Sequence, residues 1–166
     1  HEDFGENKVQ EALDKWGNMK LQKPNIKLHL LGGLQTNKVK FAIKIFDFIH
    51  SVDSKKLAKK IADEQIKHNK NIKIFIQVNL GNENQKSGVK KKELDSLFSY
   101  CKEIGLNVIG LMCIPPVNFD PVPFFKELKD LNDNLNLSDL SMGMSSDYEE
   151  AIENFSTYLR IGSEIF

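Results

Sequence analysis

Short apolar runs alternate with segments that carry an apolar stripe at helical spacing, and this pattern continues along the whole chain. Residues 1–7 fit the tail of a strand and its loop, and six clearer runs predict strands at residues 27–31, 48–52, 72–80, 108–114, 140–144 and 157–161. The first stripe, Val9 to Trp16, predicts a helix that stops at Gly17. Strand followed by helix, repeated without a low-complexity linker, predicts a parallel α/β protein.

Two architectures satisfy this alternation. A flavodoxin-like open sheet needs about five strands. A (β/α)8 barrel of the TIM type needs eight strands and typically about 250 residues. The chain has 166 residues, the length of one domain. A barrel built from this chain alone would therefore lack a part.

Composition excludes several classes of function. The 23 basic and 23 acidic side chains cancel, so the chain has no excess charge for binding nucleic acid. It contains neither a signal peptide nor a run of eighteen apolar residues, and we expect a soluble protein with no membrane partner. Cys101 and Cys113 fall on apolar patterns and are expected to pack as small hydrophobic residues. A reducing cytoplasm is the predicted compartment.

The last quarter of the chain predicts a rim that suits a phosphate. Strands at 140–144 and 157–161, joined by a helix, would be parallel neighbours whose carboxyl ends meet at one edge. The first ends near Ser145, and the second continues from Arg160 into Gly162 and Ser163. Free N–H groups and a helix N-terminus favour an anion, and the loops after strands 7 and 8 of a barrel are the usual phosphate site. The alternative is that these small residues simply form turns.

Three other side chains each allow a structural and a functional interpretation. A buried Arg160 needs an acceptor, either a carboxylate such as Glu6 or Asp53 or a heteroatom of a ligand. His29 lies within a strand, where a hydrogen-bonded core histidine is the simpler interpretation. Asn7 either caps the first helix or orients a ligand.

Weaker signals complete the candidate site. Met112 is either a core residue or a cover for a planar ring, and Lys86 either reaches the mouth of the site or is solvated. Met142 and Met144 are expected to share one face, and residues 146–149 fit a capping box. The sequence has no Ser/His/Asp arrangement, HExxH, GxGxxG or Walker loop, so it predicts no enzyme nucleophile or acid–base pair.

Several motifs occur in an order and spacing that are similar to those of the pyridoxal phosphate homeostasis protein family. They are Phe4-Gly5-Glu6-Asn7, His29-Leu30-Leu31-Gly32, Leu34-Gln35-Thr36-Asn37-Lys38, His50-Ser51-Val52-Asp53, Gln77-Val78-Asn79, Lys86-Ser87-Gly88, Gly110-Leu111-Met112, Leu140-Ser141-Met142-Gly143-Met144-Ser145 and Arg160-Ile161-Gly162. The resemblance covers essentially the whole chain. One such motif would be weak evidence, whereas the ordered set is highly specific.

The resemblance implies a single barrel domain over residues 1–166, similar to the N-terminal domain of alanine racemase, that binds pyridoxal 5′-phosphate (PLP). It implies a role in storing PLP or delivering it to PLP-dependent apoenzymes, with no known catalytic reaction. It also implies site residues. Ser145 and the N–H groups of Gly162 and Ser163 would hold the phosphate, Arg160 would face the pyridine nitrogen, Asn7 and His29 would lie near the ring, and Met112 would pack on it.

The chain departs from the family at its start. The family's Schiff-base lysine lies on the first strand in a Ser-Lys motif, and no lysine here occupies that place, since Lys38 and Lys86 belong to other motifs. We therefore expect a (β/α)8 barrel lacking its first strand and helix, with two unpaired sheet edges. Two alternatives stay open: a fragment of a PLP-dependent amino-acid racemase, and an unrelated barrel that binds a phosphorylated sugar at the same rim.

Overall fold

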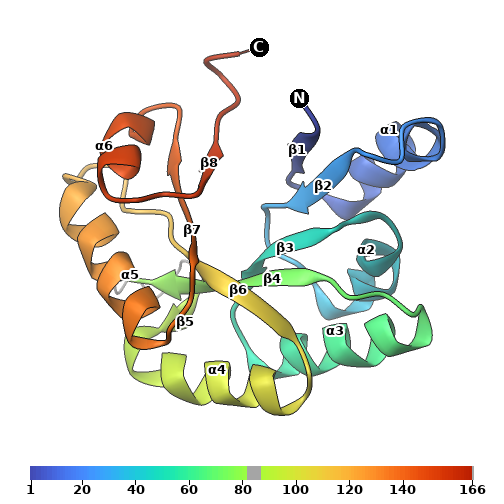
Figure 1. Ribbon diagram of the computed structural model, residues 1–166, viewed down its shortest axis with the longest axis horizontal. Coiled ribbons are helices and arrows are strands. Elements are labelled where there is room, and N and C mark those ends of the chain that lie inside the picture. Colours follow the sequence, from blue (N-terminus) through green and yellow to red (C-terminus); the bar gives the residue numbers. More distant parts are fainter. Residues whose placement is uncertain (82–86, 166) are drawn as a thin grey trace.

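A curved, fully parallel sheet forms the centre of the molecule (Figure 1). The computed structural model describes residues 1–81 and 87–165. The strands run in the spatial order β1-β2-β3-β4-β6-β7-β8, and the two-residue strand β5 pairs with β4. Their bounds are β1 Asp3–Glu6, β2 Lys27–Leu30, β3 Phe48–Val52, β4 Lys73–Asn79, β5 Val89–Lys90, β6 Asn107–Met112, β7 Asp139–Met144 and β8 Tyr158–Arg160.

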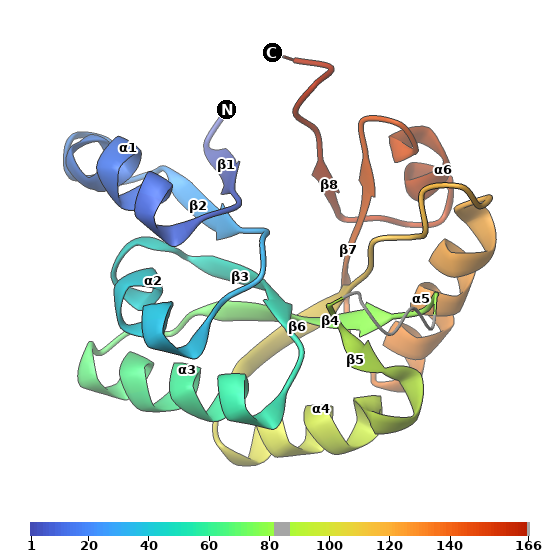
Figure 2. The same cartoon turned by 180° about the vertical axis from the view of Figure 1, so that it is seen from behind.

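In the part of the chain that the structure describes, six helices lie on the outside of the curved sheet (Figures 1 and 2). They are α1 Val9–Gln22, α2 Val39–Ile45, α3 Lys55–Lys67, α4 Leu94–Glu103, α5 Val122–Asn134 and α6 Tyr148–Glu153, with 3-10 turns at Thr36–Lys38 and Lys91–Glu93. Ser54 caps α3 by accepting a hydrogen bond from the N–H of Leu57 at 3.3 Å. Helices α1 to α5 each turn apolar residues toward the sheet, as their spacing predicts, whereas α6 buries only Ala151.

The strand order decides between the two predicted architectures in favour of the barrel. Apart from the short β5, strands that follow one another in the sequence are neighbours in space, whereas a flavodoxin-like sheet reverses its order partway. The sheet curls far enough for the ring of Tyr158 on β8 to lie 5.8 Å from that of His29 on β2. Within the described residues, β1 and β8 are the two edges of this nearly closed barrel, as expected from the sequence.

The two faces of the sheet carry different side chains because successive residues of a strand point to opposite sides. Leu28 and Leu30 of β2 belong to a large apolar cluster under the helices, whereas His29 between them points inward. The inner face holds a separate small cluster of Phe48, Phe75 and Met112. The inner face therefore contains the polar and aromatic residues from which a site can be built.

Three local predictions are wrong. Gly17 does not stop α1, which continues to Gln22, because the buried side of this helix keeps Trp16 packed on the core while Gly17 faces open space. Met142 is buried but Met144 is 43% exposed, since Gly143 takes a φ of +92° and interrupts the alternation. The expected capping box is not formed; the N-cap of α6 is Asp147, whose carboxylate accepts the N–H of Met144 at 2.6 Å.

Candidate functional site

The carboxyl ends of β7 and β8 bring two of the predicted phosphate-binding residues together. The N–H of Gly162, just after β8, lies 3.4 Å from the hydroxyl oxygen of Ser145, just after β7. Ser145 is half-buried, and Gly162 and the adjacent Ser163 are exposed to solvent. A hydroxyl and exposed backbone N–H groups at one rim form a donor set suited to an anion.

Arg160 occupies the last position of β8, and its guanidinium is held on two sides. One terminal nitrogen donates to Ser141 Oγ at 2.8 Å and the other to the carbonyl of Cys113 at 2.9 Å. In the described part of the chain no carboxylate forms an ion pair with Arg160, and Glu6 and Asp53 bond to other groups. Of the two interpretations of Arg160, the carboxylate partner is therefore wrong. A largely buried cation without a carboxylate, with N–H groups to spare, is suited to an acceptor from outside the chain.

A line of side chains continues inward from Arg160. The hydroxyl of Ser141 lies 2.8 Å from Nδ1 of His50, and Nε2 of His50 lies 3.0 Å from Nδ1 of His29. Nε2 of His29 in turn lies 3.0 Å from the carboxylate of Asp3. His29 is thus a hydrogen-bonded histidine of the interior, and both of its ring nitrogens are engaged. A ligand can therefore contact it only through the carbon atoms or the face of the imidazole ring.

Burial favours the neutral form of both imidazoles. Desolvation is the main cause that lowers the pKa of His29, and the nearby Asp3 carboxylate opposes it only in part. The pKa of His50 lies well below its usual value because of burial first and then the charges of His29 and Arg160. Arg160 also has a lowered pKa from burial, but a guanidinium remains protonated in a protein.

The series Ser141, His50, His29 and Asp3 has the composition of a hydrolytic relay, although the sequence shows no such motif. Ser141 is nevertheless 0% exposed, and its oxygen already accepts from Arg160. A nucleophile must reach its substrate, so this arrangement supports polar positioning and not attack on a substrate. Sequence reasoning missed Asp3, His50 and Ser141. For His50 and Ser141 the available signal was a polar residue within an apolar strand, 48–52 and 140–144 respectively.

Aromatic side chains pack against the two histidines in the interior of the barrel. His29 stacks on Phe48 with ring centroids 4.1 Å apart, and His50 stacks on Phe75 at 4.3 Å. The ring of Tyr158 contacts all four. Met112 is fully buried against Phe48 and Phe75, so it is a core residue of the inner face, and its contact with a ligand stays a prediction.

The remaining predicted residues have weaker structural support. Asn7 is exposed after β1, and the N-cap of α1 is Lys8 without a side-chain bond, so Asn7 is not the cap of that helix. Its carbonyl oxygen lies 2.2 Å from the place where a Cβ of residue 32 would stand, which requires the glycine found there. Lys86 lies outside the described residues.

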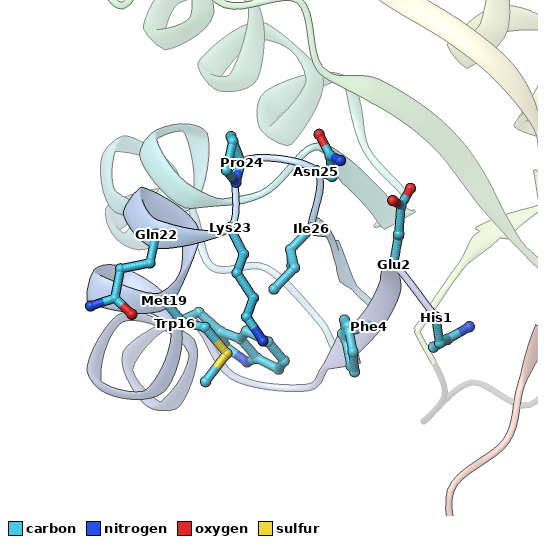
Figure 3. A pocket seen from close by; sticks show the side chains of 10 residues that line it. All are labelled: His1, Glu2, Phe4, Trp16, Met19, Gln22, Lys23, Pro24, Asn25 and Ile26. Atoms are coloured by element: carbon cyan, nitrogen blue, oxygen red, sulfur yellow. The ribbon is translucent and has the colours of Figure 1, made fainter.

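A hollow of about 640 Å³ lies elsewhere on the described surface (Figure 3). It is formed by the start of β1, the end of α1 and the loop before β2, with Phe4, Trp16 and Ile26 in its wall. This is the amino-terminal end of the strands, opposite to the carboxyl rim where barrels bind their ligands. We therefore assign the candidate site to the rim and not to this hollow.

Other kinds of site find no support in residues 1–81 and 87–165. No group of three or more His, Cys, Asp or Glu side chains there is arranged to hold a metal ion. None of the helices there has both the length and the apolar character that a membrane span requires. Cys101 and Cys113 are buried free thiols, as predicted, and burial raises the pKa of each to about 12.

Fold and site together define a parallel α/β barrel with a polar interior and a rim whose donors suit an anion. The chain belongs to the alanine racemase N-terminal domain family, whose sequence model matches residues 1–166, and within it to the pyridoxal phosphate homeostasis proteins. The protein of that name from Aquifex aeolicus is 42% identical over 98% of this chain and 75% of its own length. That from Vibrio cholerae is 35% identical over 98% and 74%.

Solved structures agree with this assignment. PipY of Synechococcus elongatus, solved with PLP bound, is 32% identical and superposes with a TM-score of 0.91 over 98% of this chain and 80% of that one. Alanine racemase of Clostridium difficile superposes with a TM-score of 0.73 over 97% of this chain and 43% of that one, but is only 12% identical. The racemase therefore shows a shared fold alone.

Proposed function

We propose that this chain binds pyridoxal 5′-phosphate at the carboxyl rim and acts in intracellular PLP homeostasis without catalysing a reaction. The observation that carries the proposal is the guanidinium of Arg160, which is fixed by Ser141 and Cys113 and has no carboxylate partner among the described residues. The names of the relatives and the PLP bound by PipY support the choice of ligand.

The donor set fits the two ends of PLP. Ser145, Gly162 and Ser163 would hold the phosphate at the exposed rim, while Arg160 would donate to the ring nitrogen. His29, Met112 and Asn7 would border the ring. PLP serves enzymes as an electron sink, and a cationic donor beside its ring nitrogen keeps that nitrogen unprotonated and weakens the sink. This electrostatic setting favours a carrier over a broad catalyst.

Binding to this chain is proposed to be non-covalent. Among the described residues no lysine is buried, and the inner face carries histidine, serine and aromatic side chains. After PLP is mixed with the chain and reduced with borohydride, mass spectrometry should find no stoichiometric pyridoxyl-lysine adduct. A full adduct at one lysine would contradict non-covalent binding and point to a covalent site.

The deciding experiment is a PLP titration of the chain and of its Arg160→Ala variant, followed by absorbance or calorimetry. Loss of a charge-assisted hydrogen bond should weaken PLP binding about tenfold. Lys67→Ala removes a cation from the outer helix α3 and should leave the affinity unchanged. Unchanged affinity in Arg160→Ala would remove Arg160 from the site.

Two comparisons separate the alternatives. Sugar phosphates should compete poorly with PLP, and strong competition would favour a barrel for a phosphorylated sugar. An alanine racemisation assay should give no turnover, and measurable turnover would favour a racemase-like enzyme. Delivery of PLP to apoenzymes and a cytoplasmic location stay predictions.

A further inference from the structure

A single row of hydrogen bonds crosses the interior of the barrel from one sheet edge to the other. It runs from Arg160 on β8 through Ser141 on β7, His50 on β3 and His29 on β2 to Asp3 on β1. The four links measure 2.8, 2.8, 3.0 and 3.0 Å. His50 and Ser141 are 91 residues apart in the sequence, so the row exists only in the folded chain.

With both rings neutral, hydrogen-bond chemistry determines the direction of every bond in this row. An ionised carboxylate only accepts, so Asp3 requires a proton on Nε2 of His29. In a neutral His29, Nδ1 is then the acceptor, and it takes the proton on Nε2 of His50. Nδ1 of a neutral His50 must likewise accept from the hydroxyl of Ser141. Two neutral imidazoles in this row therefore both carry the proton on Nε2.

The bond at the other end of the row, between Arg160 and Ser141, is compatible with this direction. Once Ser141 gives its only proton to His50, its lone pairs are free to accept, and the guanidinium of Arg160 can only donate. Donation thus runs in one direction, from Arg160 to Asp3. A proton added to either imidazole would reverse at least one bond of the row, and the burial that lowers both pKa values opposes the added charge.

This direction has a consequence for Arg160. A hydroxyl can rotate, but in Ser141 the acceptor on His50 fixes where the proton goes and hence where the lone pairs point. The guanidinium is rigid and planar, so anchoring one terminal nitrogen on Ser141 and the other on the carbonyl of Cys113 fixes its plane. Its remaining N–H groups then have a set direction.

We propose that Ser141 and His50 are positioning residues that aim Arg160 at an uncharged ring nitrogen and so make the site selective for ligands with an unprotonated pyridine. This inference rests on the proposed function. A ring nitrogen that carries a proton would present a donor and a positive charge to a fixed cation and would be rejected. Asp3 and His29 act one step further away, by setting the tautomer of His50.

The test compares two ligands in three proteins. The ligands are PLP and its 1-deaza analogue, which has a carbon in place of the ring nitrogen. The variant is Ser141→Ala, which removes one buried oxygen. The matched control is Ser51→Ala, which removes a buried hydroxyl with a bond of similar length, 2.7 Å to the carbonyl of Gly32, outside the row.

We expect the wild type and Ser51→Ala to prefer PLP over the analogue about tenfold or more, as for a charge-assisted hydrogen bond. In Ser141→Ala the preference should fall to about twofold or less, through weaker binding of PLP alone. A retained preference, or an equal loss for both ligands, would make the role of Ser141 purely structural and overturn the proposal while PLP binding stands. Failure of the wild type to bind either ligand would instead defeat the proposed function.

A measurement without ligand tests the direction of the hydrogen bonds in the row. The side-chain ¹⁵N shifts of His29 and His50 at pH 7.5 should report two neutral rings with the proton on Nε2. Ser141→Ala should change the signals of His50, whereas Ser51→Ala should not. A charged imidazole, or a proton on Nδ1 of either ring, would overturn the proposed direction whatever the ligand data show.

Discussion

The outer and inner faces of the sheet are built from the same strands but from different chemistry. Outward-facing residues such as Leu28, Ile49 and Ile74 are aliphatic and pack under the helices. Inward-facing residues such as His29, His50 and Ser141 are polar, and aromatic rings surround them. In β2 the change occurs from one residue to the next.

The difference separates stability from specificity. The outer face gains free energy in proportion to the apolar area that it removes from water. The inner face gains less, because a buried polar group must recover its lost hydration through hydrogen bonds. In the described residues every buried side-chain nitrogen or oxygen has a partner, so this cost is offset. The outer face thus holds the barrel together, and the inner face is available for recognition.

The largest expected effect comes from a cavity in the outer layer. Phe125 of α5 is fully buried in the apolar cluster, and Phe125→Ala should lower the free energy of unfolding by about 3–5 kcal/mol. Urea denaturation followed by circular dichroism measures the loss. The PLP affinity of the molecules that remain folded should not change.

A matched control is Phe119→Ala, since Phe119 is 67% exposed. Its effect on the free energy of unfolding should stay within about 0.5 kcal/mol. If PLP affinity fell together with stability in Phe125→Ala, the two faces would be coupled and their separation would be wrong.

A smaller effect should come from crowding within the sheet. A Cβ on Gly110 of β6 would stand 1.9 Å from the carbonyl oxygen of Asp139 on β7 and 2.9 Å from the ring of Phe75 on the inner face. Gly110→Ala should therefore lower the free energy of unfolding by about 1–3 kcal/mol, measured by the same urea titration.

The comparison for this variant is Gly17→Ala, because Gly17 lies in α1 with open space around it. Alanine there should raise the free energy of unfolding by about 0.5–1 kcal/mol. Equal effects at the two glycines would show that chain entropy, and not the close approach of β6 and β7, governs Gly110.

Much of the fold could be predicted from the sequence because the outer face is a strong periodic signal. The strand at Phe48–Val52 was predicted with its observed bounds, and the others within two residues. The two-residue strand β5 is too short to give a pattern, and only its pairing with β4 defines it. The helix end predicted at Gly17 was wrong because the packing of Trp16 outweighs the tendency of glycine to end a helix.

The site was less predictable because its geometry depends on strands far apart in the sequence. The carboxyl ends of β7 and β8 could be placed together, and Ser145 and Gly162 do lie near each other. The partners of Arg160 could not be derived, because a carboxylate is the usual expectation and the acceptors are a hydroxyl and a carbonyl. Only the register of the curved sheet brings His50 to Ser141.

The smallest expected effect is a pH dependence of stability that distinguishes the two faces. In the interior, burial is the main cause that lowers the pKa values of His29 and His50 from 6.5. At His29, Asp3 and Asp47 oppose the shift and Lys27 adds to it, and at His50 the neighbouring His29 and Arg160 add to it. The unfolded chain then binds more protons than the folded one. The free energy of unfolding should therefore fall as the pH drops below about 7.

On the outer helix α3, the ammonium groups of Lys60 and Lys67 hold the pKa of Glu64 at about 2, below its usual 4.5. The contribution of Glu64 to the free energy of unfolding is present above about pH 4.5 and is lost as the pH falls toward about 2. Urea midpoints measured from pH 8 to pH 3 should show both losses. His50→Gln should reduce only the loss near neutral pH, and Glu64→Gln only the acidic one. A near-neutral loss that persisted unchanged in His50→Gln would place its origin outside His50.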